Sequence, residues 1–298
     1  MTDPLSDVLT ILGARVTRRT RLEASGEWAL AFPALDRLKF VALLRGASWI
    51  MVEGRPPQRM AAGDVCLLGR TAYAVASDPE LPPLDGQALY GTPGCDAVRL
   101  GGDDMVSIGG TVAFAEGNAG FLLDMLPDFL FIPKSTAASG AMAAVLALID
   151  GEVGRDLIGG DIISARLADV FVVEAIRAYA ASAAQFEIGW LGALADPRLG
   201  RALRAIHGDI ARPWTVADLA QVAGMSRAAF SAAFTRRVGE PPLAYVRAWR
   251  LTMARAALAS GEESVASIAG KVGYTSQSAF GHAFRSAFGA APRAHARS

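Results

Sequence analysis

Two sets of hydrogen-bonding side chains stand on a motif that is repeated near the C-terminus. The first set contains Arg227 and Ser231, and the second contains Gln277, Ser278 and His282. Guanidinium, carboxamide, hydroxyl and imidazole groups are those that bond to the bases and phosphates of nucleic acids. No nucleophile–base arrangement, phosphate-binding loop or dinucleotide motif accompanies them. These side chains are therefore suited to recognising a nucleic acid rather than to catalysing a reaction.

The repeated motif explains how short helices would present these side chains. Each copy carries a small apolar pair, a glycine and two phenylalanines one helical turn apart: Leu219-Ala220, Gly224, Phe230 and Phe234, then, with one extra residue in the turn, Ile268-Ala269, Gly273, Phe280 and Phe284. The pair would pack inward on a first helix, the glycine permits the turn, and the phenylalanines anchor a second helix. The outer side of that second helix is free to face a DNA groove. The alternative is a helical repeat array, which usually needs three or more repeats.

The charge distribution favours DNA over a plain repeat array. Residues 1–200 carry 16 basic and 24 acidic side chains, a net charge of −8, whereas residues 201–298 carry 13 basic and 5 acidic, a net charge of +8. A basic C-terminal third indicates a module that binds a polyanion, and the acidic remainder indicates a second module with another task.

The N-terminal part reads as a different fold. Short apolar runs such as 40–44, 48–52 and 65–68 are cut by Gly, Pro and Asp, which predicts a sandwich or small β-barrel over about 13–135. Helical spacing follows over about 140–190, and these helices could pack on the barrel, on each other or on a second copy of the chain. We expect two domains of an α+β chain, residues 1–195 and 196–298, with an all-helical second domain. Its helix-turn-helix units would span about 215–237 and 264–288, joined by a helix over about 243–259, and Thr215 with Asp218 would cap the first unit.

Several stretches together resemble the DNA-binding domain of AraC-type transcription regulators. They are Trp214-Thr-Val-Ala-Asp-Leu-Ala, Ala223-Gly-Met-Ser-Arg, Val238-Gly-Glu-Pro-Pro, Trp249-Arg-Leu, Val272-Gly-Tyr and Ala283-Phe-Arg-Ser-Ala-Phe-Gly. Looser stretches, among them Gly63-Asp-Val-Cys-Leu-Leu and Gly189-Trp-Leu-Gly-Ala-Leu-Ala-Asp-Pro-Arg-Leu-Gly, resemble the cupin-type sensor domain of one AraC subgroup. The resemblance implies a transcription regulator, an activator or a repressor, with two recognition helices in adjacent segments of the major groove.

The resemblance also implies which residues read DNA. The expected base contacts are Arg227, Ala228, Ser231, Gln277, Ser278 and His282, and the expected phosphate contacts are Arg236, Arg237, Arg250 and Arg285. An arginine matches a guanine edge and a glutamine matches an adenine edge. Because the first copy offers Ala228 and Ala232 where larger polar side chains could stand, we expect the second copy to read more of the sequence.

The sensor half lacks the usual means of binding a metal. The three histidines, His207, His282 and His295, all lie beyond residue 200, so the barrel has no imidazole to offer. We expect no metal, no other cofactor and no enzymatic activity; a cupin enzyme fused to a DNA-binding tail is the less favoured alternative. An apolar pocket for a small-molecule effector is possible in the mouth of the barrel, and its candidate lining is Trp28, Phe40, Trp49, Met51, Cys66 and Tyr73.

The cysteines allow a second sensor hypothesis. Oxidation of Cys66 or Cys95 would make the protein a thiol-based redox sensor, although Cys66 lies in an apolar strand pattern and Cys95 beside an acid. Two cysteines and no signal-like start indicate a reduced, cytoplasmic protein without a membrane segment. Its expected partners are double-stranded promoter DNA, a small molecule, RNA polymerase and a second copy of the chain. The sequence names neither the effector nor the operator.

Overall fold

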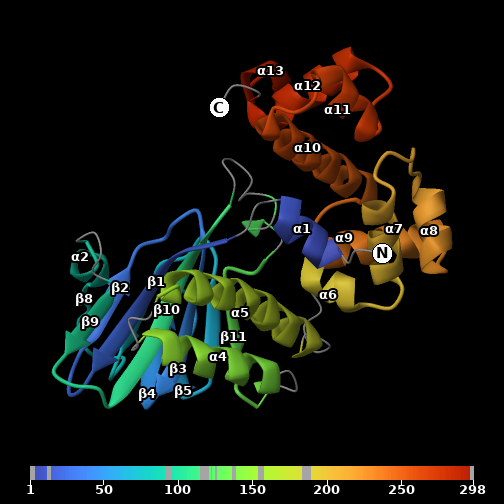
Figure 1. Ribbon diagram of the computed structural model, residues 1–298. Helices are drawn as coiled ribbons and strands as arrows, with labels where there is room; N and C mark the ends of the chain where they lie inside the picture. The colour runs from blue at the N-terminus through green and yellow to red at the C-terminus, as the bar shows by residue number, and fades with distance from the viewer. Residues whose placement is uncertain are drawn as a thin grey trace. The chain divides into compact units, whose positions relative to one another are not determined.

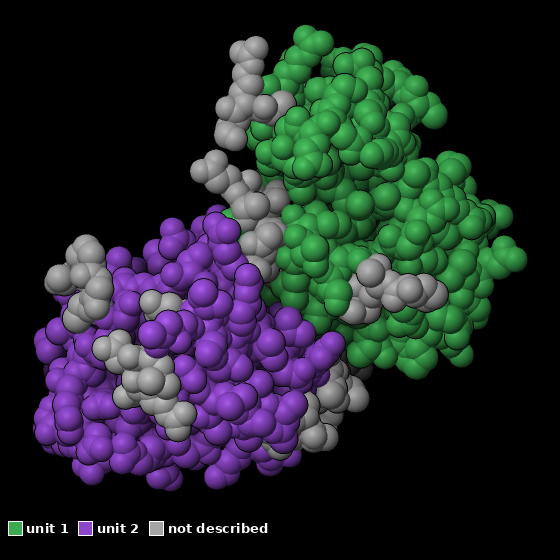
Figure 2. Space-filling model, in the orientation of Figure 1, with its two compact units in different colours: residues 1–14, 114–126, 183–298 green, residues 15–113, 127–182 purple. Residues whose placement is uncertain are grey.

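The chain folds into two compact units (Figure 2). The computed structural model describes residues 4–11, 15–91, 96–114, 121, 123–124, 126–135, 139–153, 158–182 and 189–295. The sheet unit comprises Arg15–Ala113 and Pro127–Ser182, and the helical unit comprises Met1–Ala14, Phe114–Leu126 and Ala183–Ser298. The chain passes between the units more than once, so neither unit is one continuous stretch. The expected division at about residue 195 remains a prediction.

Two sheets build the sheet unit (Figure 1). The six-stranded sheet has the order β11-β6-β3-β10-β1-β9, with β1 Arg15–Ala24, β3 Leu38–Arg45, β6 Val65–Leu68, β9 Ala97–Leu100, β10 Met105–Ala113 and β11 Phe129–Ile132. The five-stranded sheet has the order β5-β4-β7-β2-β8, with β2 Ala29–Phe32, β4 Ala47–Val52, β5 Gln58–Ala61, β7 Tyr73–Ala76 and β8 Leu84–Asp85. A short helix, α2 (Gly86–Leu89), follows β8.

One hydrophobic core joins the two sheets. Leu22 and Leu43 of the six-stranded sheet share a buried cluster with Leu30, Ile50 and Val75 of the five-stranded sheet. In β4 the alternation is plain, because Ser48, Ile50 and Val52 are buried while Trp49 and Met51 are half-exposed. Successive side chains therefore face the core and the outside in turn, as a two-sheet fold requires.

Two helices cover the outer face of the six-stranded sheet. They are α4 (Ser139–Val153) and α5 (Gly160–Ser182), which lie across this sheet in Figure 1. Phe171 of α5 packs on Phe40 of β3 with ring centroids 5.0 Å apart. Asp169 of α5 also accepts a hydrogen bond from the Val16 amide of β1 at 2.9 Å. Both faces of this sheet are consequently occupied, which explains why β3 is buried at six consecutive positions.

The described part of the helical unit consists of helices and the turns between them. They are α1 Pro4–Ile11, α6 Trp190–Ala195, α7 Leu199–Gly208, α8 Val216–Ala223, α9 Arg227–Val238, α10 Pro242–Ser260, α11 Val265–Lys271, α12 Gln277–Phe288 and α13 Pro292–His295. The predicted cap of α8 is confirmed: the Asp218 amide donates to Thr215 Oγ1 at 3.1 Å and the Thr215 amide donates to the Asp218 carboxylate at 3.0 Å. This reciprocal pair satisfies amides that the first turn of a helix leaves open. The helix begins where the sequence predicts.

A buried polar chain holds the first half of the helical unit. Trp190 Nε1 donates to the Tyr245 hydroxyl at 3.0 Å, and His207 Nε2 lies 2.7 Å from the same oxygen. The His207 ring stacks on Trp249 at 4.7 Å. These contacts tie α6 and α7 to α10. The predicted fold class, a two-sheet cupin-like part and an all-helical part with two helix-turn-helix motifs, is confirmed. No helix among the residues described is both long enough and apolar enough to cross a membrane.

Candidate DNA-binding surface and candidate ligand cavity

The two predicted recognition helices, α9 and α12, are built alike. Each has 12 residues, each begins after a serine whose hydroxyl accepts an amide hydrogen of the first turn at 3.3 Å, and each ends at a left-handed glycine. The capping serines are Ser226 and Ser276. Positive φ angles of 92° at Gly239 and 75° at Gly289 end the helices, a conformation that glycine adopts at little cost. The duplication seen in the sequence is thus a duplication of structure.

Phenylalanines fix the inner side of each recognition helix and leave the outer side open. Phe230 and Phe234 are fully buried with ring centroids 5.5 Å apart, and Phe280 and Phe284 repeat this arrangement at 5.5 Å. The outer positions lie at the surface. Those expected to read bases are exposed except for half-buried Ser231: Arg227, Ala228, Ser231, Gln277, Ser278 and His282. Arg227 and Gln277 are the first residues of their helices, so the two sets begin at equivalent places.

The four arginines expected on phosphates fall into two groups. Arg236 of α9 and Arg285 of α12 are exposed, and Arg237 is half-buried. They lie in or near the C-terminal turns of the recognition helices, where a cation also complements the helix dipole. Arg250 of α10 differs from these three because its guanidinium is engaged within the protein.

Arg250 connects the loop between α7 and α8 to the turn of the second helix-turn-helix unit. Its Nε donates to the Ile210 carbonyl at 2.9 Å and its Nη2 to the Arg212 carbonyl at 2.6 Å, both before α8. Its Nη1 lies 3.4 Å from the carbonyl of Gly273, in the turn of the second unit. Partial burial lowers the pKa of this guanidinium. A planar fork with several donors suits carbonyls in different directions, so Arg250 positions the loop before α8 and the turn of the second unit on α10.

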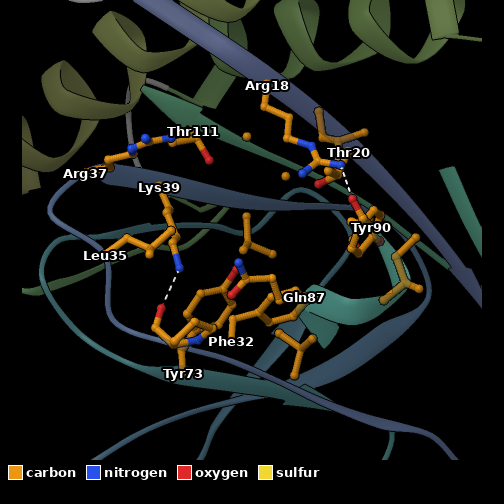
Figure 3. Close-up of a pocket in the computed structure, with 18 residues that line it drawn as sticks. Arg18, Thr20, Phe32, Leu35, Arg37, Lys39, Tyr73, Gln87, Tyr90 and Thr111 are labelled. Carbon is orange, nitrogen blue, oxygen red and sulfur yellow. Dashed lines mark hydrogen bonds between the residues drawn. The ribbon is translucent and has the colours of Figure 1, made fainter. Parts of the chain in front are cut away.

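The sheet unit contains a cavity of about 220 Å³ (Figure 3). Both sheets and α2 contribute to its wall, which is lined by Arg18, Thr20, Leu22, Phe32, Pro33, Leu35, Arg37, Lys39, Val41, Tyr73, Val75, Gln87, Tyr90, Ser107, Ile108, Gly109, Gly110 and Thr111. Gly109 leaves the β10 wall of the cavity without a side chain, whereas a side chain at Gly110 would point to the opposite face of the sheet. The Phe40 ring lies against Gly110 where a side chain would otherwise stand.

Among the described lining residues, Lys39 is the one buried charged side chain. The residue is 6% exposed, and its Nζ donates to the Pro33 carbonyl at 2.8 Å and lies 5.0 Å from the centroid of the Tyr73 ring. Burial lowers its pKa from 10.5 to about 8. Arg18, by contrast, has an acidic partner, because its Nε lies 3.2 Å from Asp96, and its Nη2 donates to the Tyr90 carbonyl at 2.5 Å.

Of the six residues expected around a pocket, Tyr73 lines this cavity. Trp28 and Cys66 are buried in the core between the sheets. Trp49 and Met51 alternate with the core residues of β4. Phe40 faces α5 while its neighbours Lys39 and Val41 face the cavity. Sequence reasoning missed the other lining residues, the cationic ones among them, and the signal for Lys39 was a lysine inside an otherwise apolar strand.

The structure does not present Cys66 as a reactive thiol. Cys66 is fully buried, its Sγ lies 3.7 Å from the Met60 sulfur, and burial raises the pKa of its thiol well above the ordinary value. A thiol held in its protonated form is a poor nucleophile. Cys95 lies outside the described residues. Redox sensing through Cys66 is accordingly not favoured.

Comparisons with known proteins agree with both units. Residues 3–181 match the model of a family described as Cupin, and residues 219–298 match one described as Helix-turn-helix domain. An AraC-like transcription regulator of Streptomyces lividans is 38% identical over 293 residues, covering 97% of this chain and 96% of its own. The transcriptional regulator AlkR of Acinetobacter baylyi is 30% identical over 302 residues, covering 98% of each chain.

A third relative extends the agreement to another bacterium. The transcriptional activator RclR of Escherichia coli is 30% identical over 294 residues, covering 97% of this chain and 95% of its own. These relatives align along nearly the whole chain, through the two sheets as well as the paired helical motifs. The chain belongs to the AraC family of transcription regulators and carries a cupin-like N-terminal domain.

Proposed function

We propose that this AraC-family protein binds promoter DNA in a sequence-specific manner and that its cupin-like domain senses a small molecule. The observation that carries the proposal is the pair of equivalent recognition helices, each anchored by two buried phenylalanines and open on its outer side. The cavity between the sheets supports the sensing half. A ligand that binds one arrangement of the protein better than another shifts the protein toward it, and so alters operator affinity or contact with RNA polymerase.

Each recognition helix would contribute both base and phosphate contacts. Arg227 and Gln277, at the start of the helices, are assigned to base edges together with Ala228, Ser231, Ser278 and His282. Arg236, Arg237 and Arg285 are assigned to phosphates. For Arg250 we propose an indirect role, because its donors already point at backbone carbonyls.

Binding to promoter DNA should be tight and sensitive to salt. Three phosphate contacts on each chain predict a fall in affinity of about fortyfold between about 50 and about 200 mM salt. Gel-shift titrations of the full-length protein with promoter fragments from the host would measure this. The proposal is wrong if no duplex among those fragments is bound at low salt.

The second recognition helix should discriminate more between bases than the first. A bidentate contact to one base accounts for about 1–3 kcal/mol of discrimination. We expect Gln277→Ala to relax base preference by about tenfold at the positions it reads, and Arg227→Ala to do so less, since its helix offers Ala228 and Ala232 beside it. Both variants would be compared on one panel of operator variants. Greater relaxation by Arg227→Ala would reverse the assignment.

The helices of the sheet unit are proposed as the contact between two copies of the chain. Leu148 of α4 and Ile162, Ile163 and Val170 of α5 are exposed apolar side chains on the two helices that cover the outer face of the sheet. Size-exclusion chromatography with light scattering should give twice the chain mass of 31.1 kDa. The double variant Ile162→Glu/Val170→Glu should be monomeric, and Lys134→Glu, which changes the charge equally, should not. A monomeric wild-type protein, with and without DNA, would refute this contact.

A further inference from the structure

The cavity of the sheet unit is positively charged. Arg18, Arg37 and Lys39 line it, and no aspartate or glutamate is among the described lining residues. Asp96 compensates Arg18. Lys39 is buried, and among the residues described its ammonium has a carbonyl and an aromatic face as neighbours but no carboxylate within ion-pair distance. A buried ammonium without a counter-charge is costly, and sites that bind anions retain such groups.

The rest of the lining is suited to an apolar body. Phe32 and Tyr73 stack with centroids 5.0 Å apart and planes within 17° of each other. Leu22, Val41 and Val75 continue this apolar wall from both sheets. In Figure 3, Lys39 extends from β3 toward Phe32 and Tyr73, so the charge and the aromatic rings meet in one place.

The volume and the charge of the cavity restrict the class of ligand further. A volume of about 220 Å³ is below the range of about 300–1,000 Å³ that accommodates drug-sized molecules, so the ligand has one or two rings at most. One buried cation without an acidic partner matches a single negative charge. A phosphate ester with two charges would find too few cations and too much apolar wall.

From this juxtaposition we infer that the cavity binds a small organic monocarboxylate, with the carboxylate on Lys39 and the apolar body beside Phe32 and Tyr73. This inference names the class of ligand for the proposed sensing function. Its role in regulation rests on that proposed function, whereas binding of the ligand to the cavity does not. Arg37, exposed and without an acidic partner among the described residues, stands beside the cavity and would attract the anion. Thr20, Ser107 and Gln87 offer neutral hydrogen-bonding groups for further substituents.

Calorimetry on the full-length protein without DNA tests this inference separately from DNA binding. The probes are benzoate, cinnamate and 2-naphthoate, with 2-naphthamide as the neutral counterpart and inorganic phosphate as the compact anion. We expect at least one monocarboxylate to bind at about pH 7, and the amide and phosphate to bind at least about tenfold more weakly. Lys39→Met should lose at least about tenfold in affinity, whereas Lys134→Met, a change at an exposed lysine of the same unit, should lose none.

The pH dependence provides a second readout. Guanidinium groups are effectively always protonated in proteins. Burial raises the pKa of Tyr73, and the Tyr90 hydroxyl donates to the Arg21 carbonyl. Lys39 is therefore the lining group expected to lose its charge as the pH rises above about 8. Carboxylate binding should weaken on going from about pH 7 to about pH 9.5 in the wild-type protein and much less in Lys39→Arg. Three outcomes would overturn the inference: the amide binds as tightly as the acid, Lys39→Met binds carboxylates as well as the wild-type protein, or none of the three carboxylates binds at millimolar concentration. If the protein still shifts promoter DNA in that case, its proposed DNA-binding function stands.

Discussion

The Lys39→Met variant is expected to be more stable than the wild-type protein at pH 7. Burial lowers the pKa of Lys39 from 10.5 to about 8, and a difference of this size corresponds to a penalty of roughly 3 kcal/mol on the charged form. Methionine fills a similar volume without a charge and suits the buried β3 strand. Allowing for the lost contacts with Pro33 and the Tyr73 ring, we expect a gain of about 1–3 kcal/mol in the free energy of unfolding.

The sign of the pH dependence gives this prediction a control. The folded-state pKa is lower than the unfolded one, so the unfolded chain binds the proton more tightly and the penalty is fully present below pH 8. It is relieved as the pH rises toward 10.5, and the advantage of Lys39→Met should shrink over the same interval. Urea titrations read by hydrogen–deuterium exchange of peptides from β3 and β10 would report the sheet unit alone. Lys134→Met, at an exposed lysine, should behave as wild type; a less stable Lys39→Met at pH 7 would contradict the account.

A stability gain at this position would carry functional meaning. Proteins commonly retain destabilising groups where a ligand has to be bound, and the bound ligand then offsets the cost. If the variant is both more stable and unable to bind carboxylates, the buried charge is explained by binding. If it is more stable and binds as well as the wild-type protein, Lys39 is simply a tolerated defect of the core.

The helical unit was predictable because its signals are local. Thr215 with Asp218, Ser226 and Ser276 cap helices through bonds to amides three residues away, and Gly224 adopts its left-handed φ of 66° one residue beyond α8. Helix caps of this kind depend on a few consecutive residues, so they can be recognised from a single sequence. The one extra residue in the second turn was also visible, because the apolar pair and the glycine keep their spacing before it and the two phenylalanines keep theirs after it.

The cavity was not predictable to the same extent, because its lining depends on which face of each strand is turned inward. A shift of one residue exchanges the faces, and β3 is buried on both, so its apolar run hides the alternation. Phe40 and Lys39 are neighbours in the sequence but lie on opposite faces of the strand: Phe40 packs on α5, and Lys39 faces the cavity. The partner that decides this, Phe171, lies more than a hundred residues away in the sequence.

Loss of Arg250 should impair folding of the helical unit and DNA binding together. Arg250→Met leaves the carbonyls of Ile210 and Arg212 without their donor and frees Gly273 from α10. Hydrogen bonds from a charged group contribute about 1.5–3 kcal/mol each, and because Arg250 is only half-buried, the two short ones together predict a destabilisation of about 2–3 kcal/mol. Arg250→Lys should recover only part of this, because one ammonium cannot reach carbonyls that lie in different directions. Thermal unfolding would be followed for both variants, with Arg247→Met, at an exposed arginine of the same helix, as the control.

The same variants separate a connecting role from a phosphate contact. A lost phosphate contact, as expected for Arg285→Met, lowers the slope of log affinity against log salt by about one and leaves unfolding unchanged. A lost connection instead lets the α7–α8 loop and the turn of the second unit move relative to α10. These two segments are tightly packed, since a Cβ at Gly273 would lie 2.6 Å from the Ala211 carbonyl oxygen. The proposed function places both recognition helices in successive groove segments at once. On that proposal, Arg250→Met should lower affinity for operators more than for unrelated duplexes while the salt slope stays nearly the same. An Arg250→Met protein with wild-type stability and a reduced salt slope would instead place this side chain on the DNA backbone.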